Sequence, residues 1–383
     1  MAEKVRYHLE KSAPELEDLH KKGLFTKPEL SIIMRRRTEF EHRITGRHAT
    51  QRDFVRYAEY EMNVERLRKK RVARLKPEKE GISQWAGPRR ILYIFDRATQ
   101  KFKGDLSLWM QYLNYARQQR SVNVVTKIFT QLLSLNPTKP EVWILAAKYE
   151  FEHNASIKAA RSIMQRGLRF NADSETLFLE YFRLELLFVS KARARRDLLD
   201  ALVDTEAGVE DEGRSSDEII ELPDVESVKG LLKTLPEFDA TMLSGDTPAA
   251  RGAVALAVYD AATATLVDTQ SFAFQALEVI DSFVDLDRHD LSTHIVIHLK
   301  TLYPADDNVL LLDITLPIRH VEHDDHRFPD LLKLTIAKYS NLADKSWNLK
   351  QLISNHMDRY LDPSLHPPLD PNIKLVIEKT FKN

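Results

Sequence analysis

The chain has 383 residues, 43% of them hydrophobic and 30% charged, and a formal net charge of -1. This composition is globular, and the absence of cysteine excludes a disulfide framework, a thiolate zinc site and a cysteine nucleophile. No apolar run approaches the roughly 18 residues of a membrane span, and the first residues are charged, so we expect a soluble, unexported protein of a reducing compartment.

The first 30 residues form an amphipathic segment ahead of the rest of the chain. Its large apolar residues are Leu16, Leu19, Leu24 and Phe25. Two interpretations are equally open: the segment docks a partner protein, or it is a capping helix that covers the end of a repeat array.

Positive charge is concentrated between Ser31 and Leu75, where 13 Lys and Arg face six Asp and Glu. The densest part comprises Arg66, Arg68, Lys69, Lys70, Arg71 and Arg74, followed by Lys76. Further arginines precede it at Arg35, Arg36, Arg37, Arg43, Arg47 and Arg52. Such a surface suits RNA phosphates or nuclear import, although a solvated helix end is the plainer interpretation.

A repeat of large residues at i, i+3 and i+6 runs through residues 31–200. Its members include Phe54, Tyr57, Trp109, Tyr112, Trp143, Tyr149, Phe178 and Tyr181. The step from Trp109 to Trp143 to Phe178 is 34 and then 35 residues, which is the period of a helical hairpin. We predict that these aromatics form the core between neighbouring repeats and do not stack on bases.

A second helix is predicted after each of these helices, at residues 90–98, 126–133 and 160–168, with short capped breaks between hairpins. The first unit, near Met34, Arg37 and Phe40, is degenerate. Residues 54–74 are predicted to form one long helix, which is terminated by Pro77 and Gly81. The fold class is therefore all-α, an alpha-alpha superhelix of stacked hairpins.

The pattern fades after residue 200. Asp204 to Asp246 carries 13 acids against three bases, so residues 201–247 are predicted to be an acidic, partly disordered linker. Residues 248–383 then resume as a C-terminal helical-repeat array. Within it, Ile295–Ile297 and Leu310–Leu312 could be strands by propensity, but the segment lengths favour helix.

A histidine-rich loop is the only part of the sequence that hints at metal chemistry. His320, Glu322, His323, Asp324, Asp325 and His326 have the ligand types of a metal site, with His294 and His298 upstream. A hydrated surface loop explains them as well, and no nucleotide-binding or hydrolase motif is present. We therefore expect no metal, no cofactor, no small-molecule substrate and no catalytic activity.

The motif that runs from Trp143 to Glu150 and from Ala160 to Leu168 resembles the half-a-TPR (HAT) repeat. The N-terminal sequence is similar to the U-three small nucleolar RNA-associated HAT proteins of the UTP-B subcomplex. The segments that carry this similarity are Pro14–Leu19, Gly23–Thr26 and Arg37–Arg43. The likeness is specific up to about Asp200. Departures from the ideal repeat occur at Arg37, at Ala146 and in the long basic loop.

This resemblance implies a non-catalytic scaffold of the small-subunit processome, located in the nucleolus and required for early processing of the 18S rRNA precursor. The partners implied are beta-propeller (WD40) subunits of UTP-B and a pre-rRNA or small nucleolar RNA particle. Two other functions stay open at this point. One is a HAT scaffold in splicing or mRNA 3'-end processing, and the other is a TPR-like adaptor with a basic carboxylate clamp in its concave groove.

Overall fold

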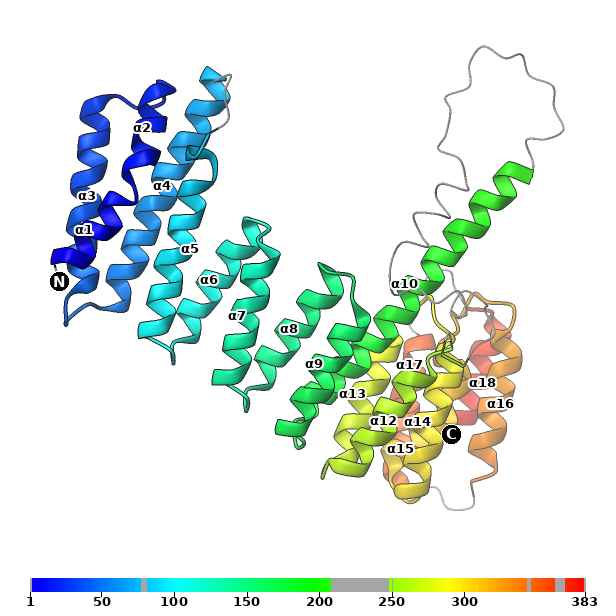
Figure 1. Ribbon diagram of the computed structural model, residues 1–383. Helices are drawn as coiled ribbons and strands as arrows, with labels where there is room; N and C mark the ends of the chain where they lie inside the picture. Colours follow the sequence, from blue (N-terminus) through cyan, green and yellow to red (C-terminus); the bar gives the residue numbers. More distant parts are fainter. Residues whose placement is uncertain are drawn as a thin grey trace, which may run out of the picture. The chain divides into compact units, whose positions relative to one another are not determined.

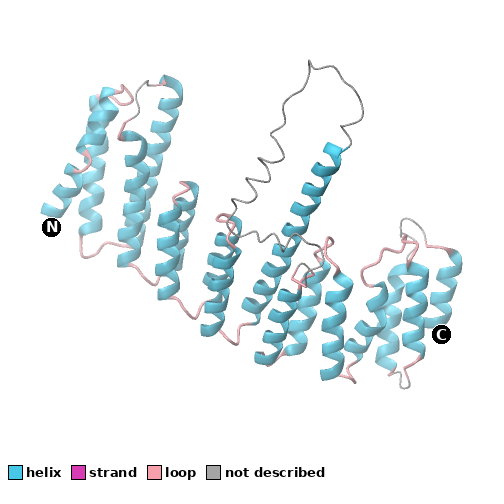
Figure 2. Cartoon of the chain, turned by 45° about the vertical axis from the view of Figure 1, so that its right-hand side comes forward, coloured by secondary structure: helices cyan, strands magenta, loops and turns pink. Residues whose placement is uncertain are grey.

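The structure is a computed structural model that describes residues 2–76, 81–207, 248–249, 251–342, 346–361 and 369–381. Every regular element within these ranges is helical, which confirms the predicted all-α class (Figures 1 and 2). The chain divides into two compact units, Met1–Pro137 and Thr138–Asn383. The boundary between these units lies within residues 31–200.

The first unit consists of two short N-terminal helices followed by consecutive antiparallel helices (Figure 1). These are α1 (Ala2–Glu10), α2 (Ala13–Lys21), α3 (Lys27–Thr45), α4 (Gln51–Leu75), α5 (Ser83–Lys101), α6 (Leu106–Gln118) and α7 (Val122–Leu135). Each helix from α3 onward packs on the next, while α1 contacts α3 and α2 contacts both α3 and α5. The two N-terminal helices therefore cover the first repeat unit.

Local sequence explains where these helices begin and end. Thr26 and Thr50 start α3 and α4 with capping boxes completed by Glu29 and Asp53, which satisfy free backbone N–H groups at each N-terminus. The α4 helix runs to Leu75, as predicted, and ends at Lys76 in a left-handed conformation with φ of 43°. The long basic segment is therefore continuous helix.

The second unit begins with the hairpin of α8 (Pro140–Glu152) and α9 (Ile157–Phe170), followed by the long α10 (Glu175–Ala207). Its later elements are α12 (Ala253–Thr265), α13 (Thr269–Asp281), α14 (Arg288–Leu302), α15 (Asp307–Thr315), the short η2 (Leu316–Ile318), α16 (Phe328–Ser340), α17 (Trp347–Leu361) and α18 (Pro371–Phe381). The helical interpretation of 295–297 and 310–312 is confirmed by α14 and α15.

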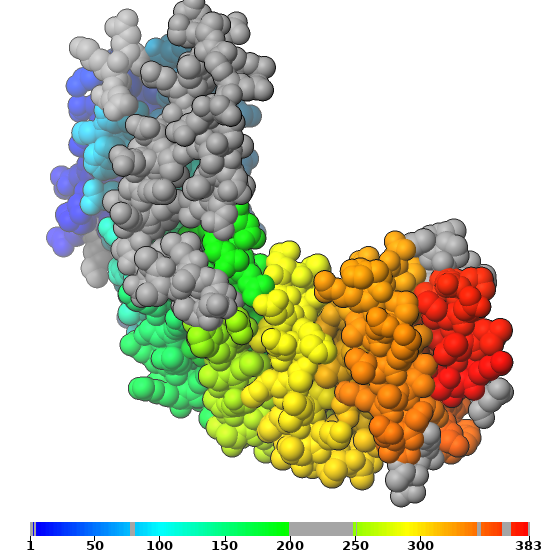
Figure 3. Space-filling model, turned by 90° about the vertical axis from the view of Figure 1, so that its right-hand side faces the viewer, coloured from blue at the N-terminus to red at the C-terminus, as the bar shows by residue number. Residues whose placement is uncertain are grey.

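The α10 helix joins the repeats of this unit to its C-terminal helices. It contacts α8 and α9 on one side and α12 and α13 on the other. Residues 201–207 of the predicted linker belong to α10, and the remainder of that linker up to 247 lies outside the described residues. Figure 3 shows the C-terminal part of this unit in space-filling form. There α14 (yellow), α16 (orange) and α18 (red) lie at the surface.

The core of each hairpin is built from the repeat aromatics. All eight side chains are buried: Phe54, Tyr57, Trp109, Tyr112, Trp143, Tyr149, Phe178 and Tyr181. They meet aromatic neighbours on adjacent helices, as in the stacked pairs Phe40–Tyr57 and Phe95–Tyr112, with ring centroids 5.1 and 5.8 Å apart. Burial of these rings leaves none of the eight with a face for base stacking.

Candidate functional site

The basic segment of α4 separates into exposed and internally paired side chains. Arg66, Lys69, Lys70 and Arg74 are exposed on the helix, together with Lys76 at its end. Because α4 is continuous here, successive cations project from one rigid element. Exposed Lys and Arg in such an arrangement can bind phosphates through charge and counterion release.

Arg68 and Arg71 are engaged in hydrogen bonds within the protein. Arg68 is buried and donates from Nε and Nη2 to the carboxylate of Glu65 at 2.7 and 2.6 Å. Arg71 donates to Glu29 at 2.9 and 2.7 Å and to the carbonyl oxygen of Leu24 at 2.8 Å. The hydrogen bonds from Arg71 lower the pKa of Glu29 to about 2. Arg68 therefore forms its ion pair within α4, and Arg71 links α4 to α3. The exposed basic surface of α4 consists of Arg66, Lys69, Lys70 and Arg74.

The upstream arginines divide in the same way. Arg35, Arg36, Arg43, Arg47 and Arg52 are exposed, whereas Arg37 is 1% exposed and paired with Glu61. Burial opposes the charge on Arg37, but Glu61 and Glu15 outweigh it and raise its pKa. Arg37 is therefore part of the core.

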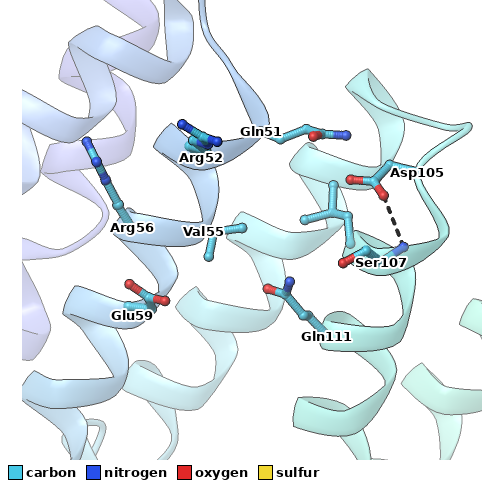
Figure 4. A pocket seen from close by; sticks show the side chains of 9 residues that line it. Gln51, Arg52, Val55, Arg56, Glu59, Asp105, Ser107 and Gln111 are labelled. Carbon is cyan, nitrogen blue, oxygen red and sulfur yellow. Dashed lines mark hydrogen bonds between the residues drawn. The ribbon is translucent and has the colours of Figure 1, made fainter.

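A polar groove lies between the start of α4 and the start of α6 (Figure 4). Its volume is about 360 Å³, and Arg52 and Arg56 line it together with Glu59 and Asp105. Asp105 accepts a hydrogen bond from the Ser107 backbone N–H at 3.0 Å and so caps α6. Two cations and two anions among its lining residues make this a mixed-charge groove. It lacks the excess of positive charge that a carboxylate clamp requires.

The apolar residues proposed for partner docking lie in the interior of the first unit. Leu19, Leu24 and Phe25 are between 2 and 3% exposed and pack with Ile33 in one cluster, against which Leu16 also packs. Val64 and Val72 of α4 join this cluster. These side chains thus hold α2 and the following loop against α3 and α4, as a cap would.

The histidines are distributed over several separate hydrogen-bond pairs. Nε2 of His320 lies 2.9 Å from the Ser292 hydroxyl, and His294 and His298 contact Asp260 and Tyr259 at 3.0 and 3.1 Å. His326 is exposed beside Asp325. Within the described ranges, no group of three or more His, Asp or Glu side chains is arranged to hold a metal ion.

A second candidate site is a cavity beside α1 and α2. The sequence analysis did not predict the residues that line it. Trp85 and Tyr93 are half-exposed aromatics on α5, and His8, Arg89 and Arg90 lie near them. None of them is one of the large residues that recur at i, i+3 and i+6, so that repeat carried no signal for them. The hint that the sequence offered was Trp85, a tryptophan a few residues beyond the basic segment.

Comparison with known proteins finds a family similarity in the region around these helices. Residues 9–90 match the family model described as U3 small nucleolar RNA-associated protein 6. Over this segment the chain is similar to that family. The match covers α2, α3 and α4 and ends within α5, so it includes both the apolar cap and the basic segment.

Curated relatives that match longer parts of the chain carry the same name. The Schizosaccharomyces pombe U3 small nucleolar RNA-associated protein 6 is 41% identical over 231 residues, which is 58% of this chain and 47% of that protein. The Homo sapiens homolog is 33% identical over 199 residues, or 51% and 33% of the two chains. The Dictyostelium discoideum homolog is 26% identical over 350 residues, 86% of this chain and 55% of its own length. The chain thus spans about half the length, or less, of these relatives. No helix within the described ranges is both long enough and apolar enough to span a membrane.

Proposed function

We propose that this chain is a non-catalytic scaffold subunit of the small-subunit processome that acts in early processing of the 18S rRNA precursor. The observation that carries the proposal is the match of residues 9–90 to the U3 small nucleolar RNA-associated protein 6 family. Three relatives named for that association support it, and one of them aligns with 86% of the chain. The proposed location is the nucleolus.

The architecture supports a scaffold because stacked helical hairpins expose long surfaces and bury their aromatic residues in the core. We infer that the protein partners are beta-propeller subunits of the UTP-B subcomplex. We also infer that RNA in the particle is contacted by the exposed basic surface of α4, namely Arg66, Lys69, Lys70 and Arg74.

Affinity purification of the tagged chain from nuclear extract tests the proposal. We expect stoichiometric beta-propeller proteins together with small nucleolar RNA and the precursor of 18S rRNA. Depletion of the protein should lead to accumulation of uncleaved precursor. Copurification with splicing or mRNA 3'-end factors in place of these components would instead favour the other HAT-repeat function. Recovery of neither set would contradict both.

A further inference from the structure

A cavity of about 550 Å³ lies in the first unit between the two N-terminal helices and α5. We name it the N-terminal chamber. Helices α1 and α2 contribute His8 and Pro14, and α5 contributes Trp85 and Tyr93. Helix α3 contributes Arg37, which is buried, and we call the part of the lining around it the floor. The chamber is separate from the exposed basic surface of α4 and from the groove shown in Figure 4.

The floor of the chamber has an unused hydrogen-bond donor. Arg37 uses Nε and Nη2 to bind Glu61 at 2.8 and 2.9 Å, but its Nη1 is buried without a hydrogen-bond partner. A buried guanidinium N–H normally has an acceptor, since an unmade hydrogen bond is costly. Because Arg37 also lines the chamber, an acceptor oxygen that enters it is the partner that this N–H lacks.

Charge at the floor restricts which oxygen this can be. Glu15 and Glu41 also line the chamber, and each is paired with an arginine, Arg90 and Arg97 respectively. With these carboxylates matched by arginines, the floor has no excess positive charge. An incoming phosphate or carboxylate would meet two acids there. A neutral acceptor such as a peptide carbonyl fits better.

The rim of the chamber has a different character. Trp85 is 52% exposed and Tyr93 45% exposed, and Ile82 adds an exposed aliphatic surface. Two cations line the chamber with them: Arg89, whose guanidinium lies 5.7 Å from the Trp85 ring centroid, and Lys11. An apolar surface bordered by cations complements a ligand that combines large apolar and acidic side chains.

We propose that the N-terminal chamber binds an extended segment of a partner protein that places a large apolar side chain among acidic residues. The apolar side chain packs against Trp85 and Tyr93, and a backbone carbonyl accepts the free N–H of Arg37. The flanking acids face Lys11 and Arg89. Aromatic rings and arginines could also bind unpaired RNA bases, but the paired acids at the floor oppose the phosphates that accompany them. The inference rests on the scaffold function proposed above and names the chemistry of one partner.

Selection of short random peptides displayed on phage against the intact chain tests this directly. We expect enrichment of sequences with one or two large apolar residues among Asp and Glu. Their synthetic forms should bind wild type and bind Trp85→Ala and Arg89→Glu at least about tenfold more weakly, as when an interface anchor is removed. Trp347→Ala is the matched control, because Trp347 is 76% exposed in the second unit and should leave binding unchanged.

Three results would overturn the proposal: enrichment of basic or purely apolar peptides, no enrichment, or binding that Trp85→Ala does not weaken. A short oligouridine provides the alternative arm. If it binds wild type, displaces the peptides and loses affinity on Trp85→Ala, the chamber is an RNA site. Circular dichroism of each variant checks that the fold is intact. Because binding is measured on the isolated chain, failure here is distinguishable from failure to copurify processome components.

Discussion

Arg37 and Glu61 form a buried, two-pronged ion pair between α3 and α4, with Nε and Nη2 of the arginine 2.8 and 2.9 Å from the two carboxylate oxygens. Arg161 and Glu185 repeat the arrangement between α9 and α10, with both distances at 2.7 Å. The separation along the chain is 24 residues in each case. The pairing therefore links the second helix of one hairpin to the first helix of the next.

Removing one partner of the Arg37–Glu61 pair should destabilise the first unit strongly. Arg37→Met removes both close hydrogen bonds to the buried Glu61 carboxylate and leaves it the longer contact with Arg90, at 3.5 Å. Breaking a buried ion pair by removing one partner costs roughly 3–5 kcal/mol. Hydrogen exchange of α3 and α4 peptides in the full chain measures the loss. Arg37→Met combined with Glu61→Leu should recover most of it. Arg35→Met, which breaks an exposed pair with Glu39, is the control and should change little. Equal effects of Arg35→Met and Arg37→Met would contradict this account.

The hairpins could be predicted from the sequence because burial repeats at helical spacing. Trp109, Trp143 and Phe178 each fill an equivalent position, so a period of about one hairpin is visible without any structure. The same template made Arg37 look like an irregularity. The structure shows instead that Arg37 is the counterpart of Arg161, and that Glu61 corresponds to Glu185.

The exposed part of the basic segment could not be predicted in this way. A run of charges reports composition, whereas exposure depends on partners that fold back from distant positions. Arg71 donates hydrogen bonds to Glu29, 42 residues earlier in the chain, and a further one to the backbone carbonyl oxygen of Leu24. The N-terminal chamber is similar: Glu15 reaches Arg90, 75 residues away. Such pairs follow from tertiary packing and leave no periodic signal in one sequence.

Gly167 should not tolerate a side chain. In an ordinary helix interior, Gly→Ala stabilises by about 1 kcal/mol. Here an added Cβ would lie 2.9 Å from Cγ and 3.1 Å from Cβ of Trp143, whose ring also stacks on Phe170. Overpacking of this kind costs about 1–3 kcal/mol, so Gly167→Ala should lower the thermal stability of the second unit. Gly104→Ala meets nothing within 4 Å and is the control. A gain of stability in Gly167→Ala would refute the close contact.

Acid should destabilise the second unit through His320. Burial lowers the pKa of His320 from 6.5 to about 4, against the opposing influence of Asp281 and with help from Arg288, Arg319 and His289. Since the folded-state pKa lies below the unfolded one, the stabilising contribution is complete above pH 6.5 and is lost as pH falls toward 4. The shift corresponds to roughly 3 kcal/mol.

Urea unfolding of His320→Gln as a function of pH should therefore show a smaller loss of stability between pH 6.5 and 4 than wild type. Some loss will remain, because burial also lowers the pKa of His356 to about 4. His326→Gln is the matched control from the same loop, since the His326 side chain is 83% exposed. Parallel pH profiles for wild type and His320→Gln would rule out this role for His320.

The basic surface of α4 carries the final prediction. Reversing Lys69, Lys70 and Arg74 to glutamate should weaken the salt-sensitive association of the chain with precursor RNA particles, because each lost phosphate contact lowers the slope of log affinity against log salt by about 1. Arg71 is left intact, since its bonds to Glu29 and Leu24 hold α4 to α3. Gradient sedimentation over a series of salt concentrations measures the effect. Reversal of Lys139, Lys158 and Lys191, exposed lysines of the second unit, controls for net charge. If both triple variants sediment with particles as wild type does at every salt concentration, α4 does not contact RNA.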